Sequence, residues 1–95
     1  MPAYLIADIE VTNPAEFEEY RKGVPATIAQ YGGKYIVRGA PVESLEGGWT
    51  MKRVVILEFP SMAQAKAWYN SPAYKDLLAL RLRSTKSKAV LVEGL

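Results

Sequence analysis

The stretch "KRVVILEF", residues 52–59, decides the fold of this 95-residue chain. Its β-branched run from Val54 to Ile56 favours an extended conformation, because branching at Cβ fits the pleated surface of a sheet. Pro60-Ser61 follows and ends the strand. Ser61 then serves as the N-cap of a helix through "MAQAKAWY". A strand that passes directly into a helix is one half of an alternating α and β architecture.

Two strands and one helix are predicted before this stretch. Residues 3–11, "AYLIADIEV", alternate in polarity well enough to form a strand. The helix that follows has Asn13 as its N-cap and Pro14 at its first position, and the glycine pair at 32–33 ends it. Residues 34–39, "KYIVRG", then form the second strand, and a glycine-containing loop leads back to "KRVVILEF".

Breaks are predicted inside both helical regions. Gly23 and Pro25 should kink or split the first helix midway. In "AWYNSPAYKDLLALR", residues 67–81, the second helix stops and restarts, with Ser71 as the new cap and Pro72 at the new first position. This break is either a structural corner or one wall of an aromatic pocket, and both interpretations stay open.

The last strand is "KAVLVEG", residues 88–94, so the order of elements is β-α-β-β-α-β. This order predicts an α+β fold, the ferredoxin-like sandwich, in which a four-stranded antiparallel sheet carries both helices on one face. A chain of this length forms one domain, residues 1–95.

The face of the sheet away from the helices should be apolar. If Leu5 and Ala7 point toward the helices, Ile6 and Asp8 point away, and the same alternation applies to the other strands. The apolar side chains assigned to this open face are Ile6, Ile36, Val54, Ile56 and Leu91, and its charged side chains are Asp8, Arg38 and Glu58. Soluble monomers rarely expose so large an apolar patch, so we expect a homodimer whose two sheets face each other.

The composition excludes several classes of chemistry. The chain has no cysteine and no histidine, which rules out thiol nucleophiles, Ser-His-Asp triads, and zinc or haem sites that need those ligands. No clustered acidic motif suggests a metal, and we expect no cofactor. A net charge of +2 does not by itself indicate nucleic acid. Any catalysis would depend on carboxylates, tyrosines, lysines, arginines or the backbone.

Charge is distributed unevenly along the chain. The charged residues among positions 1–20 are all acidic, whereas those among positions 75–88 are mainly basic. The two groups either form solvated faces that contact each other or a partner subunit, or create an anion-attracting C-terminal face. Neither a signal peptide nor a run of ~20 apolar residues is present, so a cytoplasmic location is expected and no membrane contact is predicted.

Several motifs together resemble one known family over nearly the whole chain. They are "GGKYIVRGAP" (32–41), "LEGGW" (45–49), "KRVVILEFPS" (52–61), "AWYNSPAY" (67–74), Arg81 and "VEG" (92–94). The chain is similar to the domain of unknown function 1330 family, within the dimeric α/β-barrel superfamily. The resemblance implies a homodimer with pockets between sheet and helices or within the barrel, and it implies no particular reaction. Ala40 departs from the glycine expected there.

Carried over by position, the resemblance marks Tyr20, Arg38, Gly39, Glu46, Arg53, Trp68, Tyr69, Ser71, Tyr74 and Arg81. We predict a cleft that binds a small anionic or carboxylate-bearing metabolite, because guanidinium groups match carboxylate and phosphate geometry. Its ligand-binding candidates are Arg38, Arg53, Trp68, Tyr69, Ser71, Tyr74 and Arg81. The candidate proton carriers for cofactor-independent acid/base catalysis are Asp8, Tyr20 and Glu58.

Three other interpretations compete with this one. A non-enzymatic dimeric scaffold would use the same charges only to satisfy one another. An N-terminal proline at position 2, exposed if Met1 is removed, would be a base in the manner of tautomerases. An RNA-recognition module shares the element order, but its stacking aromatics are missing from the exposed strand faces, so no nucleic-acid partner is expected.

Overall fold

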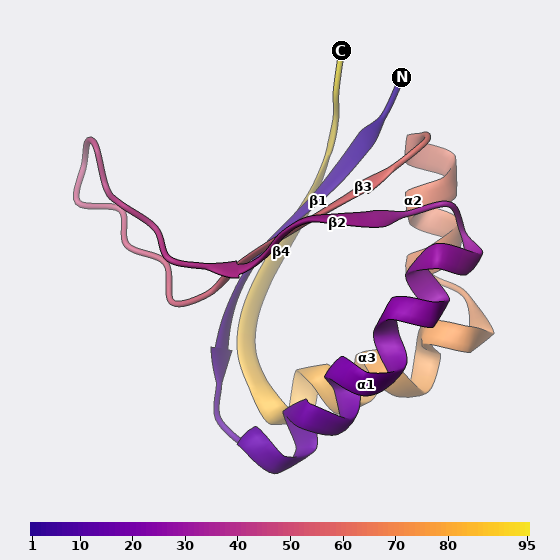
Figure 1. The fold of residues 1–95 in the computed structure, drawn as a ribbon, viewed down its shortest axis with the longest axis horizontal. Helices are drawn as coiled ribbons and strands as arrows, with labels where there is room; N and C mark the ends of the chain where they lie inside the picture. The colour runs from indigo at the N-terminus through magenta and orange to yellow at the C-terminus, as the bar shows by residue number, and fades with distance from the viewer.

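The computed structural model describes residues 1–95 and shows one curved sheet with its helices packed on one side (Figure 1). The elements are β1 (Ala3–Val11), α1 (Pro14–Gln30), β2 (Lys34–Ala40), β3 (Val54–Phe59), α2 (Met62–Tyr69), α3 (Pro72–Ser84) and β4 (Thr85–Glu93). The strands pair antiparallel in the order β2-β3-β1-β4. The predicted α+β, ferredoxin-like architecture is therefore confirmed, with the second helical region divided into α2 and α3.

The helix caps form as predicted. The Asn13 side chain accepts a hydrogen bond from the Glu16 amide, and Ser61 accepts one from the Gln64 amide. At the corner between α2 and α3, the Ser71 hydroxyl donates to the carbonyl of Trp68 at 2.7 Å and accepts from the amide of Tyr74 at 3.2 Å. One side chain thus closes the end of α2 and opens α3.

The first helix is not split, contrary to the sequence prediction. It runs without interruption through Gly23 and Pro25. A Cβ at Gly23 would lie 3.0 Å from a methyl carbon of Leu77 on α3, so the missing side chain allows the two helices to approach. Tertiary packing of this kind outweighs the weak local preference of a glycine and the one hydrogen bond that a proline removes. The last strand was predicted to begin at Lys88, but α3 continues to Ser84 and β4 begins directly after it at Thr85.

The core lies between the sheet and the helices. Its largest fully buried side chains include Trp68, Tyr74 and Phe59. The Trp68 ring has its centroid 4.0 Å from that of Tyr74 and 5.4 Å from that of Phe59. The indole Nε1 donates to the Thr27 hydroxyl at 3.0 Å, which satisfies its buried N–H.

A β-bulge in β2 reverses the predicted orientation of Arg38. The pairing with β3 shifts between Tyr35 and Val37, so that Arg38 lies opposite Val55. Residues directly opposite in a sheet share a face, and a one-residue shift moves every following side chain to the other face. Arg38 therefore points toward the helices. Simple alternation along the strand had wrongly placed it on the open face. The bulge residue is Ile36.

The predicted orientation of β4 is also wrong. Leu91 pairs with Leu5, which faces the helices, and Leu91 packs against the core. The side chains of β4 on the open face are instead those that alternate with Leu91, namely Val90 and Val92, which are 60% and 45% exposed. The prediction for Ile6, Val54 and Ile56 agrees with the structure, since these side chains line a groove on the open face.

The segment 41–53, here called the arm, projects from the sheet on the side away from the helices (Figure 1). It carries exposed apolar side chains, of which Leu45 is 91% and Trp49 73% exposed. Together the arm and the open face enclose a groove of about 630 Å³. Val42, Trp49 and Met51 form the arm side of this groove.

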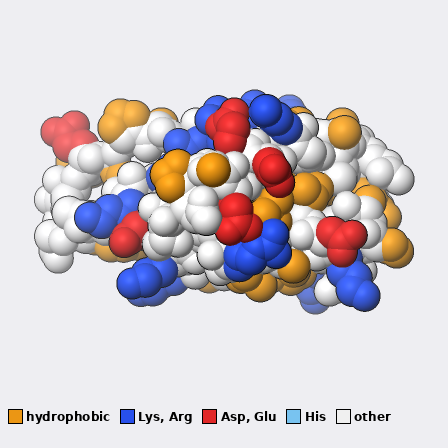
Figure 2. Space-filling model, turned by 90° about the horizontal axis from the view of Figure 1, so that it is seen from below, with side chains coloured by type: hydrophobic (Ala, Val, Ile, Leu, Met, Phe, Trp, Pro, Cys, Tyr) orange, Lys and Arg blue, Asp and Glu red, His pale blue; other side chains and the backbone are white.

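The acidic and basic parts of the chain meet in space. Glu10 pairs across the sheet with Lys86 and Asp8 with Lys88, while Glu16 forms an ion pair with Arg83. Figure 2 shows acidic and basic side chains interspersed over the face seen from below. The ion pair and the cross-strand positions support the interpretation of two charged groups that contact each other. No helix combines the length and the hydropathy of a membrane span.

Candidate functional site: an arginine-lined cavity

A small cavity of about 40 Å³ lies between the sheet and the helices. Its wall is mostly apolar, yet it includes the polar or charged side chains of Tyr20, Arg21, Tyr35, Arg38, Arg53, Tyr74 and Arg81. None of the residues that line it is acidic. The volume has room for about three water molecules in the free protein. Four guanidinium groups thus surround one cavity without a carboxylate in its wall.

Arg81 is the most deeply buried of the four arginines. It projects from α3 and is only 4% exposed. Its Nη1 donates to the Ser87 hydroxyl at 3.4 Å, while its Nε has no hydrogen-bond partner. No ion pair in the structure includes it. A buried cation without a partner is costly, and such groups usually have a counter-ion.

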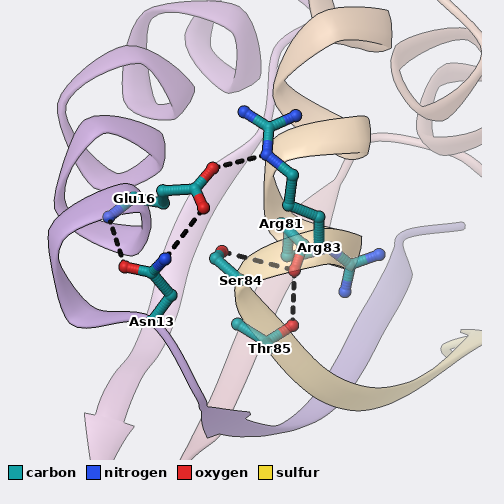
Figure 3. Close-up of polar contacts among 6 residues, drawn as sticks. All are labelled: Asn13, Glu16, Arg81, Arg83, Ser84 and Thr85. Atoms are coloured by element: carbon teal, nitrogen blue, oxygen red, sulfur yellow. Dashed lines mark hydrogen bonds and ion pairs between the residues drawn. The ribbon is translucent and has the colours of Figure 1, made fainter.

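The backbone around Arg81 is firmly held. Its carbonyl accepts a hydrogen bond from the Thr85 hydroxyl at 2.6 Å and a longer one from Ser84 at 3.4 Å. Two residues further along, Arg83 binds the Glu16 carboxylate, which also accepts from the Asn13 side chain (Figure 3). In Figure 3 the Arg81 guanidinium extends away from Glu16. The nearby acid is therefore engaged by Arg83, and the end of α3 holds Arg81 in place.

Two tyrosine hydroxyls meet beside Arg81. The Tyr20 hydroxyl lies 2.8 Å from that of Tyr74, and both residues are buried. Burial raises the pKa of Tyr20 and, second to burial, so does the neighbouring Tyr74. Burial also raises the pKa of Tyr74, although the Arg81 charge lowers it in part. Both hydroxyls stay protonated near neutral pH, and because one of them donates to the other, the pair has one O–H left for another acceptor.

Arg38 and Arg53 approach the cavity from the sheet. The Arg38 guanidinium lies over the Tyr35 ring, 4.6 Å from its centroid, and that of Arg53 lies 5.6 Å from the centroid of Phe17. The Arg53 guanidinium also rests against Gly39, where a Cβ would be 2.6 Å from its Cζ. Neither arginine belongs to an ion pair, and the Nε of Arg53 is buried without a partner.

Sequence reasoning missed two residues of this wall. Arg21 follows Phe17 by one helical turn, and that spacing was the available signal for its position. Its guanidinium contacts Glu18 at 3.3 Å, and its Nε is buried without a partner. Tyr35 precedes the β2 bulge and lies opposite Leu57 on the face toward the helices, so strand alternation was the available signal for its position. Burial raises the pKa of Tyr35, and the charge of Arg38 is the largest influence that opposes this rise.

The structure brings together Tyr20, Arg38, Arg53, Trp68, Tyr74 and Arg81 of the predicted residues. It does not bring Tyr69 or Ser71 to the cavity, because both border a separate surface hollow at the corner between α2 and α3. Tyr69 packs against the edge of the core instead, and Ser71 caps α3. The corner therefore has a structural role of its own, and it also orients Trp68 and Tyr74.

The two carboxylates proposed as proton carriers lie on the open face. Asp8 accepts from the backbone amides of Lys52 and Arg53, at 2.9 and 3.3 Å, and so anchors the end of the arm. Glu58 pairs with Lys34 at 3.4 Å. The sheet separates both from the cavity, since their strand neighbours on the other face line it. Pro2 and residues 41–52 of the arm, which include Glu46, also lie outside the cavity wall.

An antiparallel sheet that buries a pocket under its helices defines a ferredoxin-like α+β protein. The chain belongs to the family described as domain of unknown function (DUF1330), whose model matches residues 2–95. Comparison with curated proteins finds no match.

Solved structures share this fold at low sequence identity. A protein of unknown function from Rhodopseudomonas palustris is 18% identical with a TM-score of 0.78, over 99% of this chain and 82% of that one. A dimeric ferredoxin-like protein of unknown function from Jannaschia sp. is 12% identical with a TM-score of 0.66, over 99% and 100%. SnoaB, a cofactor-independent oxygenase from Streptomyces nogalater, is 12% identical with a TM-score of 0.67, over 99% and 93%. At these identities the likeness concerns the fold alone.

Proposed function

We propose that this protein binds a small metabolite carrying a carboxylate or a similar oxyanion in the arginine-lined cavity. The observation that carries the proposal is Arg81, which lines the cavity, is buried, lacks an acidic partner and has an unpaired Nε. An anion seated there would neutralise the guanidinium and accept its free hydrogen bonds. The mostly apolar wall would hold the carbon skeleton of such a ligand.

The tyrosine pair supports the same function. Because the Tyr20 and Tyr74 hydroxyls stay protonated and one donates to the other, the pair supplies one neutral donor beside Arg81. No carboxylate in the wall could remove a proton from the ligand. Binding is therefore the function that the geometry supports best, and any proton transfer inside the cavity would involve these hydroxyls.

The test is a thermal-shift screen against small carboxylates and phosphates, repeated with Arg81→Met. A ligand at ~100 Kd should stabilise the wild-type protein by ~2.7 kcal/mol and raise its Tm by several degrees. The variant should lose this shift. Because the wild-type cation has no partner, its replacement by an apolar side chain of similar length should leave the unliganded protein as stable or more stable.

Arg83→Met is the matched control. Arg83 lies on the same helix but points outward to Glu16 and is not part of the cavity wall. The ligand-induced shift should persist in this variant. If Arg81→Met destabilises the unliganded protein and no anion shifts the wild-type Tm, the charges serve only the fold, and the non-enzymatic scaffold becomes the better description. Should Arg81→Met fail to fold, Arg81→Lys repeats the test, because it keeps the charge but loses the planar fork of guanidinium donors.

A second proposal concerns assembly. We infer that the chain forms a homodimer through its open face, because Val90, Val92 and the arm residues Leu45 and Trp49 leave an extended apolar surface uncovered. The Jannaschia protein of the same fold is described as dimeric. A second copy whose sheet covers this face would remove it from water.

Light scattering after gel filtration tests the dimer. Val90→Lys places a charge on the open face and should convert the dimer to monomer at micromolar concentration. Leu82→Lys is the control, since Leu82 is 57% exposed but lies on α3, on the helical side of the molecule. A wild-type protein that is monomeric under these conditions would contradict the proposal.

A further inference from the structure

The polar groups of the cavity are arranged at two different depths. At the inner end, Arg81, Tyr20 and Tyr74 are all buried. Toward the surface, Arg38 is exposed, while Arg53 and Tyr35 are half-buried. All six line the same cavity. The wall therefore changes from a fully desolvated guanidinium to one that solvent reaches.

Each arginine group acts on its own tyrosines. Burial is the largest influence on the pKa values of Tyr20 and Tyr74 and raises both, while the charge of Arg81 lowers both. The charges of Arg38, Arg21 and Arg53 are among those that act on Tyr35. These pairings agree with the ring contact of 4.6 Å between Arg38 and Tyr35. The cavity thus has two cationic ends, each with its own phenolic donor.

A ligand with one negative charge would satisfy only one of these ends. Seated at Arg81, it would leave Arg38 and Arg53 without an acidic partner, as they are in the free protein. The cavity wall also contains apolar side chains from the sheet, among them Ala7, Val55 and Leu57. Such a wall suits a short carbon chain, and the volume of about 40 Å³ limits that chain to a few atoms.

We propose that the ligand is a short dicarboxylate, with one carboxylate at Arg81 and the Tyr20–Tyr74 pair and the other at Arg38 and Arg53. This inference rests on the proposed function and specifies its ligand class. The exposed Arg38 attracts the incoming anion, and the buried Arg81 receives the carboxylate that enters first. The ligand so bound bridges the sheet to α3.

Titration calorimetry with matched ligands tests the proposal. The dicarboxylates oxalate, malonate, succinate and glutarate are compared with monocarboxylates of the same carbon number. The best dicarboxylate should bind about tenfold more tightly than its monocarboxylate match, because it gains a second charge-assisted contact. Inorganic phosphate, which carries its charge on one centre, should bind no better than a monocarboxylate.

Two variants locate the carboxylates. Arg81→Met should weaken both ligand classes. Arg38→Met should weaken only the dicarboxylate and leave the monocarboxylate affinity within about twofold, so that the advantage of the second carboxylate disappears. Arg83→Met, outside the cavity, should change neither affinity.

The possible failures are distinct. If monocarboxylates bind as tightly as dicarboxylates, or if phosphate binds as tightly as the best dicarboxylate, the two-ended ligand is wrong while anion binding stands. The same holds if Arg38→Met weakens both classes equally. If no anion of any class binds the wild-type protein, both this inference and the proposed function are wrong.

Discussion

The hydroxyl of Tyr20 on α1 lies 2.8 Å from the hydroxyl of Tyr74 on α3, although 54 residues separate them in the chain. The contact joins two helices at the inner end of the cavity, beside the buried Arg81. It is both a buried hydrogen bond within the fold and part of the proposed anion site, so its removal should affect stability and binding.

Tyr20→Phe should destabilise the protein by about 1–2 kcal/mol, because the buried hydroxyl of Tyr74 loses its partner. For a domain of this size the Tm should fall by about 4–8 °C per kcal/mol. Thermal unfolding followed by circular dichroism measures the change. Tyr31→Phe is the control, since the hydroxyl of the half-buried Tyr31 makes no hydrogen bond within the protein. Equal losses in the two variants would show that the hydroxyl pair contributes nothing.

Alkaline pH should destabilise the fold. Burial raises the pKa of Tyr20, Tyr35 and Tyr74 above the ordinary tyrosine value of about 10. Above about pH 10 the unfolded chain releases these protons while the folded protein retains them, so the free energy of unfolding falls as pH rises. Below that pH these groups contribute no pH dependence. Urea midpoints between about pH 8 and about pH 11 measure the effect, and Tyr20→Phe should reduce the slope.

Gly39→Ala should weaken anion binding. Gly39 has φ +74°, and a Cβ there would displace the guanidinium of Arg53. Gly47→Ala is a matched control, because Gly47 has the same φ but no atom within 4 Å of the added carbon. Both variants carry a backbone strain of at most about 1–2 kcal/mol. Only Gly39→Ala should raise the Kd for the anion that the thermal-shift screen identifies, and an equal rise in both variants would mean that strain alone is responsible.

Thr27→Val should destabilise the protein by about 1–3 kcal/mol. The Thr27 hydroxyl accepts the indole N–H of Trp68 at 3.0 Å and donates to the carbonyl of Val24 at 2.8 Å. Valine preserves the shape but leaves a buried indole donor unsatisfied. Thr12→Val, at an exposed position, should have little effect. Urea denaturation of both variants measures the difference. If Thr27→Val leaves the free energy of unfolding unchanged, the hydrogen bond from Trp68 to Thr27 does not stabilise the fold.

Much of the fold could be predicted from local sequence signals. The strand at residues 3–11, the caps Asn13, Ser61 and Ser71, and the order of elements all follow from short-range chemistry that any chain segment carries with it. The continuity of α1 did not, because Gly23 allows contact with Leu77, a residue far along the chain. The positions of Asp8 and Glu58 on the open face were predicted, but not their separation from the cavity.

The candidate site could be predicted from the sequence only in part. Residue types indicated that arginines and aromatics would carry any function of a chain without histidine or cysteine, and six of the predicted side chains do meet in one cavity. Arg21 and Tyr35 were missed, and Tyr69 and Ser71 were included although they lie elsewhere.

The sequence by itself determined which elements form and in which order, because caps, β-branching and alternation act between residues close in the chain. It also determined the chemistry that is available. Only the tertiary structure decided which face each strand presents, since that depends on the bulge in β2 and on the pairing of Leu5 with Leu91. A shift of one residue in strand pairing moves every side chain of the strand to the other face of the sheet. Only packing against the rest of the chain selects the correct pairing. Arg38 reaches the cavity for that reason.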